Sequence, residues 1–236
     1  MGLLVVLLFT SCGKENRWDC IKRTGDMVSE TRNLGSFYGV RSMDNINVIL
    51  VQDTAYYVRL EAGENLIDGI TTRLDHGFLE IGNSNKCSWS RSYDREVNAY
   101  VGFIDIDSLY HQGYGSITSE GVLSTDQLDI TILNNGDVNL EINALFCSAN
   151  MHQAGDLILS GEAGWVEIWS SGVQWTRCSN LISNYFRIVT KSTGDALVNT
   201  TDSIHAEISG SGNVYYSGSP TVVKSIITGT GSLIKN

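Results

Sequence analysis

The sequence predicts an all-β protein: a parallel β-helix-like solenoid of about 19-residue coils, with an N-terminal β layer capping it. The first observation is a glycine, followed by a small or acidic residue and usually an apolar one, that recurs every ~19 residues in the second half of the chain. A fixed period of this length is typical of a solenoid in which each repeat forms one coil. The recurring glycines are Gly115, Gly136, Gly155, Gly172, Gly194, Gly212 and Gly231.

The second observation is a polar and apolar alternation in register with these glycines. Positions four, six and eight residues before each glycine are mostly apolar, as with Leu128, Ile130 and Ile132 before Gly136, and the positions between them are mostly polar. Such alternation is typical of a strand with one buried face. We therefore expect the buried faces of successive coils to stack into one column.

The glycines recur at the predicted corners of the coils. We expect a positive φ there, because a tight corner requires it and glycine adopts it most easily. The corner at Gly172 departs from the pattern, because Gln174 follows it where an apolar residue is expected. We expect an irregular coil there.

Four segments follow from these patterns. Residues 1–11 are predicted to be a lipoprotein signal peptide, 12–32 a lipid-anchored tether, 33–106 an N-terminal β region and 107–236 the repeat region. The N-terminal β region alternates like strands but lacks the glycine signal, so we predict a separate layer that covers one end of the solenoid. Such a cover is needed because an open end offers unpaired backbone groups to other strands.

Composition excludes some partners and cofactors. The formal net charge of −10 over 236 residues argues against a nucleic-acid partner. No cysteine and histidine spacing resembles a zinc site, and no cofactor or metal is expected. Asp137, Asp156 and Asp195 follow corner glycines and could hold a cation, but satisfying backbone groups in the turns is the favoured role for short acidic side chains.

The N-terminus indicates export. Residues 3–9 are an apolar run too short to span a bilayer, and the following Thr10-Ser11-Cys12 resembles the lipobox of bacterial lipoproteins. This resemblance implies that Cys12 is the lipid attachment site and that the membrane is a partner through the lipid anchor. The expected location is the cell envelope, as an outer-membrane lipoprotein that faces the periplasm or the surface.

The other cysteines are assigned from their positions. Cys20 and Cys87 both lie outside the repeats, and we treat them as a candidate disulfide in an exported protein. Cys147 occupies an inward column, and Cys178 lies two coils further on, about 10 Å along the rod. That distance exceeds the reach of a disulfide, so both are expected to be unpaired.

Several stretches taken together resemble the bacterial head GIN domain family of autotransporter adhesins. They are residues 37–40, 58–67, 77–81, 229–233 and, most specifically, 209–220 (SGSGNVYYSGSP). The resemblance covers about residues 32–236 and implies a β-helix-like envelope lipoprotein typical of Bacteroidetes. It transfers no catalytic residue, because the matching positions are structural glycines. The middle corners, such as Asn134-Asn135-Gly136, depart from the family's more regular Ser-Gly-Ser-Gly.

Trp165, Glu167 and Trp169 form the candidate ligand surface. The alternation places Val166 and Ile168 inward, which puts both indoles outside, flanking Glu167. Exposed indoles suit partner binding, including stacking on sugar rings. The alternative is that the irregular coil at Gly172 shifts the register and buries them, or that a loop covers them.

The leading functional hypothesis is therefore a non-enzymatic envelope lipoprotein that acts in adhesion or ligand binding, with a glycan or an envelope protein as partner. A structural spacer or scaffold in an envelope assembly is the second. A polysaccharide-active β-helix enzyme is the third and least favoured, since the basic residues Arg187 and Lys191 are read more simply as solvated surface.

Overall fold

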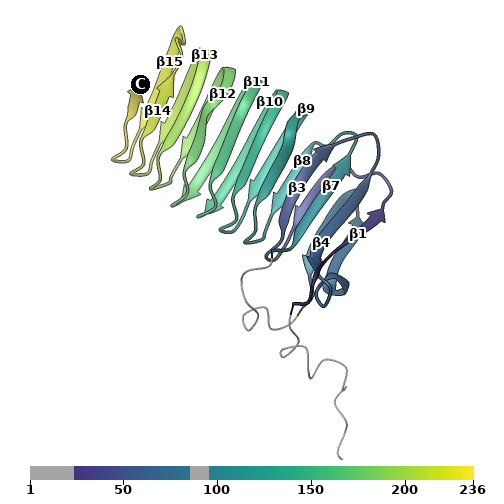
Figure 1. Ribbon diagram of the computed structural model, residues 1–236. Helices are drawn as coiled ribbons and strands as arrows, with labels where there is room; N and C mark the ends of the chain where they lie inside the picture. The colour runs from purple at the N-terminus through teal and green to yellow at the C-terminus, as the bar shows by residue number, and fades with distance from the viewer. Residues whose placement is uncertain (1–23, 86–95) are drawn as a thin grey trace, which may run out of the picture.

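The computed structural model describes residues 24–85 and 96–236, and these form a β-solenoid of about seven turns with coils of about 19 residues. The strands stack side by side along one rod, which carries the chain's C-terminus at one end (Figure 1). The predicted fold class is confirmed. The repeat strands are β9 (Ile117–Ile132), β10 (Val138–Gln153), β11 (Leu157–Gly172), β12 (Thr176–Thr190), β13 (Ala196–Ile208), β14 (Val214–Ser217), β15 (Val222–Ile227) and β16 (Leu233–Lys235).

Each long strand runs through a bend without interruption. β9 to β13 contain 13 to 16 residues each, and neighbouring strands pair in parallel on both sides of the bend. A coil therefore has one tight corner, at the glycine, and one bend inside a continuous strand.

The cap contains only part of the N-terminal β region that was predicted to form it. Strands β2 (Gly39–Ser42), β3 (Asn47–Gln52), β6 (Phe78–Asn83), β7 (Asn98–Phe103) and β8 (Ser108–His111) pair in parallel and continue the solenoid. The end is closed by β1 (Met27–Asn33), β4 (Tyr57–Gly63) and β5 (Ile70–Asp75). In the described part of the chain the antiparallel pairs are β1 with β4, β4 with β7 and β5 with β6. A short 3-10 helix (Ile67–Gly69) connects β4 to β5.

The coils of the N-terminal half are not stacked in chain order. β2 lies between β6 and β8, and β3 lies between β7 and β9. The coil that the chain forms first is therefore enclosed by two coils that it forms later.

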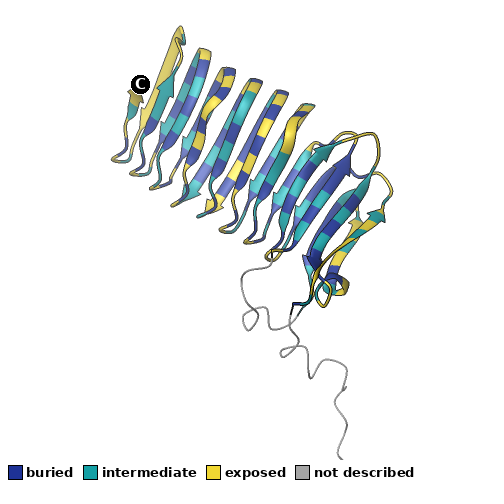
Figure 2. Cartoon of the chain, viewed as in Figure 1, coloured by how far each residue is buried: buried dark blue, intermediate teal, exposed yellow. Residues whose placement is uncertain are grey.

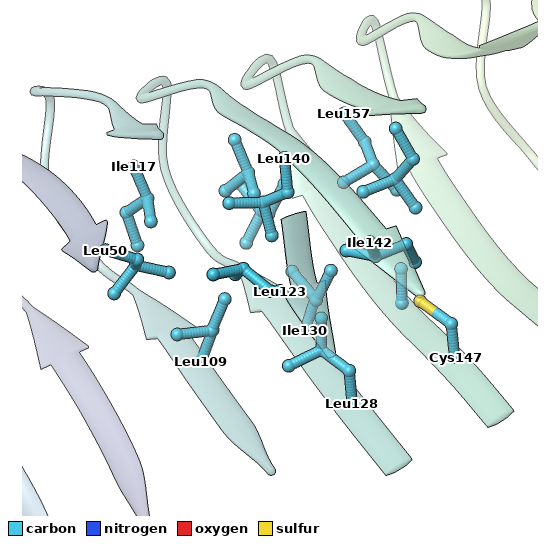
Figure 3. Packing of buried hydrophobic residues seen from close by; sticks show 14 of the residues in the cluster. Leu50, Leu109, Ile117, Leu123, Leu128, Ile130, Leu140, Ile142, Cys147 and Leu157 are labelled. Atoms are coloured by element: carbon cyan, nitrogen blue, oxygen red, sulfur yellow. The ribbon is translucent and has the colours of Figure 1, made fainter. Parts of the chain in front are cut away.

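The interior is a set of stacked apolar columns. Leu128 lies beside Cys147, which lies beside Val166, and all three are buried. The side chains of Leu128 and Cys147 point into the interior with other buried residues such as Ile130 and Ile142 (Figure 3). Buried and accessible positions alternate along much of β10 to β13, as a strand with one buried face requires (Figure 2).

The corner glycines are required by close stacking, and the positive φ expected of them is wrong for all but one. Of the seven, only Gly172 has positive φ, at 139°. A Cβ on Gly212 would lie 2.1 Å from the carbonyl oxygen of Gly194, and one on Gly231 would lie 2.1 Å from the carbonyl oxygen of Gly212. Each corner therefore rests on the backbone of the corner before it, which leaves no room for a side chain.

The coil at Gly172 is irregular, as the sequence predicted. The next corner glycine does not stack on Gly172, since a Cβ on Gly194 would lie 2.2 Å from the carbonyl oxygen of Gln174. Gln174 is buried, and its Nε2 donates a hydrogen bond of 3.1 Å to the carbonyl oxygen of Met151. A polar side chain thus replaces an apolar one by bonding to the backbone of the coil before it.

The residue after a corner glycine often links two coils. An Asp or Asn carboxyl or amide oxygen accepts the backbone N–H of the equivalent residue one coil later, which satisfies a turn group that the ladder leaves free. The cation role considered for these aspartates is therefore not needed to explain them. The pairs are Asp156 N–H to Asp137 (2.8 Å), Trp175 N–H to Asp156 (2.7 Å), Asn213 N–H to Asp195 (2.7 Å) and Ser232 N–H to Asn213 (3.0 Å).

His111 is a buried ionisable group beside a corner. Its Nε2 donates to the carbonyl oxygen of Gly115 at 2.9 Å, and its Nδ1 has no hydrogen-bond partner among the described residues. Burial lowers the pKa of His111, and this effect outweighs the opposing influences of the Gly115 carbonyl and the Asp137 carboxylate. The ring is therefore held neutral in the fold.

Replacing Gly212 with alanine is expected to destabilise the fold. The new Cβ meets a backbone carbonyl that cannot move without shifting a coil, and overpacking of this kind costs about 1–3 kcal/mol. Gly35→Ala is the control, since a Cβ there meets only the flexible end of Leu74 at 3.5 Å. Urea denaturation followed by circular dichroism measures both, and equal midpoints for the two variants would refute close stacking as the reason for the glycine.

Asp156→Ala is expected to lower the free energy of unfolding by about 1 kcal/mol, because the Trp175 N–H loses its acceptor. Asp156→Asn retains that acceptor oxygen and loses only the contact with Arg177, at 3.2 Å. The free energy of unfolding of Asp156→Asn should therefore be closer to that of the parent protein. The same denaturation measurement tests the pair, and an equal loss in both variants would mean that the charge, and not the link between coils, is what matters.

The pKa of His111 predicts a pH dependence of stability. Because the folded pKa lies below the ordinary value of 6.5, the unfolded chain binds this proton more readily. The stability from this group is complete above about pH 6.5 and falls as the pH drops toward the folded pKa. Melting temperatures from pH 8 to about pH 5 should decline less steeply in His111→Gln than in the parent. Parallel declines would contradict the assignment.

Candidate functional site

The bends of three neighbouring strands bring aromatic side chains together on the outer surface. Phe146 of β10 lies beside Trp165 of β11, which lies beside Tyr185 of β12. Trp165 and Tyr185 are each 43% exposed, and their rings stack with centroids 5.3 Å apart and planes 29° apart. Parallel coils place equivalent side chains one strand spacing apart, which is why such a row forms.

Two aliphatic side chains extend the aromatic row. Leu145, next to Phe146, is 69% exposed, and Ile182 in the bend of β12 is 50% exposed. We call Leu145, Trp165, Ile182 and Tyr185 the bend-edge patch. An outward cluster of large apolar side chains is unusual on a solvated surface and marks a contact site more often than scattered apolar residues do.

A hollow of about 470 Å³ adjoins the patch at Leu145. Its walls combine polar, acidic and apolar side chains from the first coils of the rod and from the bends of β9 and β10. The lining residues are Gln52, Ile104, Asp105, Ser124, Thr125, Asp126, Asn143, Ala144 and Leu145.

A charged cluster lies next to the patch on β11, β12 and β13. Arg187 forms ion pairs with Glu167 on one side and with Glu207, at 2.9 Å, on the other. Hydrogen bonds from Arg187 to the two carboxylates raise the pKa of its guanidinium. The guanidinium carbon also lies 5.6 Å from the centre of the Trp169 ring. Arg187 is thus held between two carboxylates and an indole.

The three residues of the predicted ligand surface therefore differ in availability. Trp165 is exposed and joins the bend-edge patch, whereas Glu167 is engaged by Arg187 and Trp169 is half-buried beside it. The Trp165 ring also stacks on Tyr185, so part of its flat face is covered by protein. The use of this surface for a ligand remains a prediction.

Sequence reasoning missed Tyr185 and Ile182. Counting back from the glycines placed Tyr185 nine residues before Gly194 but Trp165 seven before Gly172, so the two did not align. The register of β11 and β12 is constant from Trp165 and Tyr185 to Ser170 and Thr190. The mismatch arises at the corner, where Gly194 stacks against the carbonyl oxygen of Gln174, two residues after Gly172. What the sequence still shows is that a large apolar side chain stands at an outward-facing position of the alternation in both coils.

The structure describes two of the five cysteines. Cys12, Cys20 and Cys87 lie outside the described residues. Cys147 and Cys178 are unpaired and buried, as predicted. Burial raises the pKa of the Cys147 thiol to about 12 and raises that of Cys178 as well, which makes both unreactive.

Within the described part of the chain, no three His, Cys, Asp or Glu side chains gather as metal ligands would. His152 lies at the surface, 3.1 Å from the hydroxyl of Ser171, and His205 lies beside Glu207 at 4.0 Å. Across residues 24–85 and 96–236, no helix has the length and apolar character needed to cross a membrane.

Comparison with known proteins agrees with this fold. A putative adhesin from Bacteroides fragilis NCTC 9343 superposes with a TM-score of 0.83 at 21% identity, over 89% of this chain and 97% of that one. A putative adhesin from Parabacteroides distasonis ATCC 8503 has a TM-score of 0.70 at 16% identity, over 90% and 98%. A putative lipid binding protein from the same organism has a TM-score of 0.67 at 19% identity, over 90% and 97%.

At these identities the structural likeness concerns the fold alone. No curated protein matches the chain. The family model for the putative auto-transporter adhesin, head GIN domain, matches residues 36–220, which is most of the chain. With its stacked coils and glycine corners, the chain therefore belongs to the head GIN domain family.

Proposed function

We propose that this protein is a non-enzymatic, lipid-anchored envelope protein whose rigid solenoid presents a surface for adhesion or ligand binding. The bend-edge patch is the observation that carries the proposal. It places four exposed apolar side chains on three successive strands beside a hollow with polar walls. Apolar surface with polar groups at its margin suits a protein partner or a glycan, whose rings have apolar faces and polar edges.

The patch is built on a stiff support. Trp165 and Tyr185 lie on the central strands of the rod, each of which is paired on both sides, and they stack on each other. Arg187 is tied to Glu167 and Glu207 in the neighbouring positions. A preorganised surface loses little conformational entropy when a partner binds, which favours affinity.

The anchor follows from the lipobox-like sequence ending at Cys12. Two or more acyl chains at this residue would hold the protein stably to a membrane. The tether predicted over residues 12–32 would be shorter, because Met27–Asn33 form strand β1 of the cap. It would end before Thr24, which lies beside the cap in contact with Gly63. In this arrangement the capped end faces the membrane and the C-terminal end points away from it. Location in the outer membrane, toward the periplasm or the surface, belongs to the same proposal.

A structural spacer within an envelope assembly is the second candidate, and the rod shape with its regular stacking favours it. A polysaccharide-active enzyme has less support. The family and its solved neighbours are named as putative adhesins or a putative lipid binding protein. Arg187, on the same strand as Tyr185, is already paired with two carboxylates.

A glycan array probed with the soluble form, residues 13–236, tests the proposal. We expect binding to at least one glycan class, and a loss of about tenfold or more in affinity in the double variant Trp165→Ala and Tyr185→Ala. Tyr114→Ala is the matched control, because it removes an exposed aromatic ring at a glycine corner away from the bends.

The outcomes separate the three candidate functions. Binding that survives the double variant would reject the bend-edge patch. No binding to any glycan, with an envelope protein still retained from envelope extract by the double variant, would favour the spacer. New reducing ends after incubation with acidic and neutral glycans would favour the enzyme.

A further inference from the structure

The C-terminal end of the solenoid is an open edge. Among the described strands, β15 pairs only with β13 and β16 pairs only with β14, so the outer side of each is unpaired. β14 and β15 both pair with β13 and form the last full coil, and β16 pairs with β14 and begins the next layer, at the end marked C (Figure 1). Unpaired backbone N–H and C=O groups along a strand are a template for another strand.

The apolar interior is uncovered at this end. Val223 and Ile227 lie beside Ile204 and Ile208, which are buried. They continue the same inward columns, but they are 46% and 45% exposed because no described strand lies over β15. All six residues of β15 are exposed (Figure 2). The open edge thus combines free backbone groups with an apolar face.

The opposite end of the rod is protected against strand addition. Its outer strands β1 and β5 carry charged side chains, and these form the ion pairs Glu30 with Arg32 (2.7 Å) and Arg73 with Asp75 (4.0 Å). Charges on an edge strand oppose pairing with another chain. The one charged residue of β15 is Lys224, which lies beside the outward His205. The inward apolar positions of β15 therefore have no charged side chain that would oppose pairing with another strand.

The charge of the last coil indicates the kind of occupant. Residues 208–236 contain Lys224 and Lys235 and no Asp or Glu, although the whole chain has 26 acidic and 16 basic residues. A positive edge on an acidic protein attracts carboxylates and opposes pairing with the same edge of a second copy.

We propose that this edge binds an extended peptide segment of another protein, which adds a strand to β15. The backbone ladder would supply the pairing, and side chains at alternate positions would supply the specificity. The segment carries apolar residues four positions apart, which cover Val223 and Ile227. It carries an acidic residue directly after the first of them, beside Lys224, in a parallel strand that continues the stacking of β13 and β15.

This site is independent of the bend-edge patch. It lies on the last coil, whereas the patch is formed by β10, β11 and β12. Loss of glycan binding would leave this proposal intact, and failure of peptide binding would leave the patch intact.

The test uses a fluorescent heptapeptide, acetyl-Thr-Val-Glu-Thr-Thr-Val-Thr-amide, and a peptide of the same composition with the two valines adjacent. Fluorescence anisotropy with the chain of residues 13–236 should show saturable binding of the first peptide and not of the second. Hydrogen exchange should slow at the amides of β15 when the first peptide is present, and remain unchanged elsewhere on the rod.

Three variants locate the site. Ile227→Lys places a charge on the inward column of the edge and should abolish binding. Lys224→Glu should weaken binding about fivefold or more, and less so in high salt. Val173→Lys, at an exposed apolar position on a corner away from the edge, should change nothing. Ile227 and Lys224 are exposed, so unchanged melting temperatures are expected and serve to check that the variants fold.

Three results would overturn the proposal. The first is no saturable binding of the designed peptide to the parent protein, and the second is equal binding of both peptides. The third is a dimer in sedimentation that Ile227→Lys dissociates, because the occupant of the edge would then be a second copy of this chain.

Discussion

The fold depends on how closely one backbone corner approaches the next. At Gly212 and Gly231 a single added carbon would lie 2.1 Å from a carbonyl oxygen of the preceding corner. This approach keeps successive coils at strand spacing on both faces, so that Leu128, Cys147 and Val166 can stack in one apolar column. The Asp and Asn side chains that accept N–H groups from the next coil reinforce the same contact. Without the narrow corner, neither the columns nor the outward rows of the bends would align.

The period and the alternation were sufficient to predict the solenoid, because each coil repeats the same burial pattern against its neighbour. The reason for the glycines was not accessible in the same way, since a glycine that avoids a clash and one that adopts positive φ are identical in a sequence. The N-terminal half was harder for a different reason. Its parallel strands pair with partners far away in the chain, as when β3 pairs with β7 and β9, and no local pattern records that order.

The candidate site was only partly visible in the sequence. Outward parity identified Trp165 correctly as a surface residue, but the irregular coil at Gly172 hid its stacking with Tyr185. The ion pairs of Arg187 with Glu167 and Glu207 arise from three different coils. Contacts between coils depend on register, and register can change by a residue or more wherever a strand contains a bulge.

The enclosure of the β2–β3 coil between later coils has a consequence for how the molecule assembles. In the second half, each coil pairs with the one just before it, so ordered structure can grow one layer at a time. The β2–β3 coil, in contrast, has no complete neighbour until β6, β7, β8 and the start of β9 are all available. The 80 residues that follow Gly39, up to Ser119, must therefore all be available before this layer can be closed on both sides. The N-terminal coil can therefore be completed only after strands from the middle of the chain have formed. We expect the closure of this coil to be the slowest step of folding.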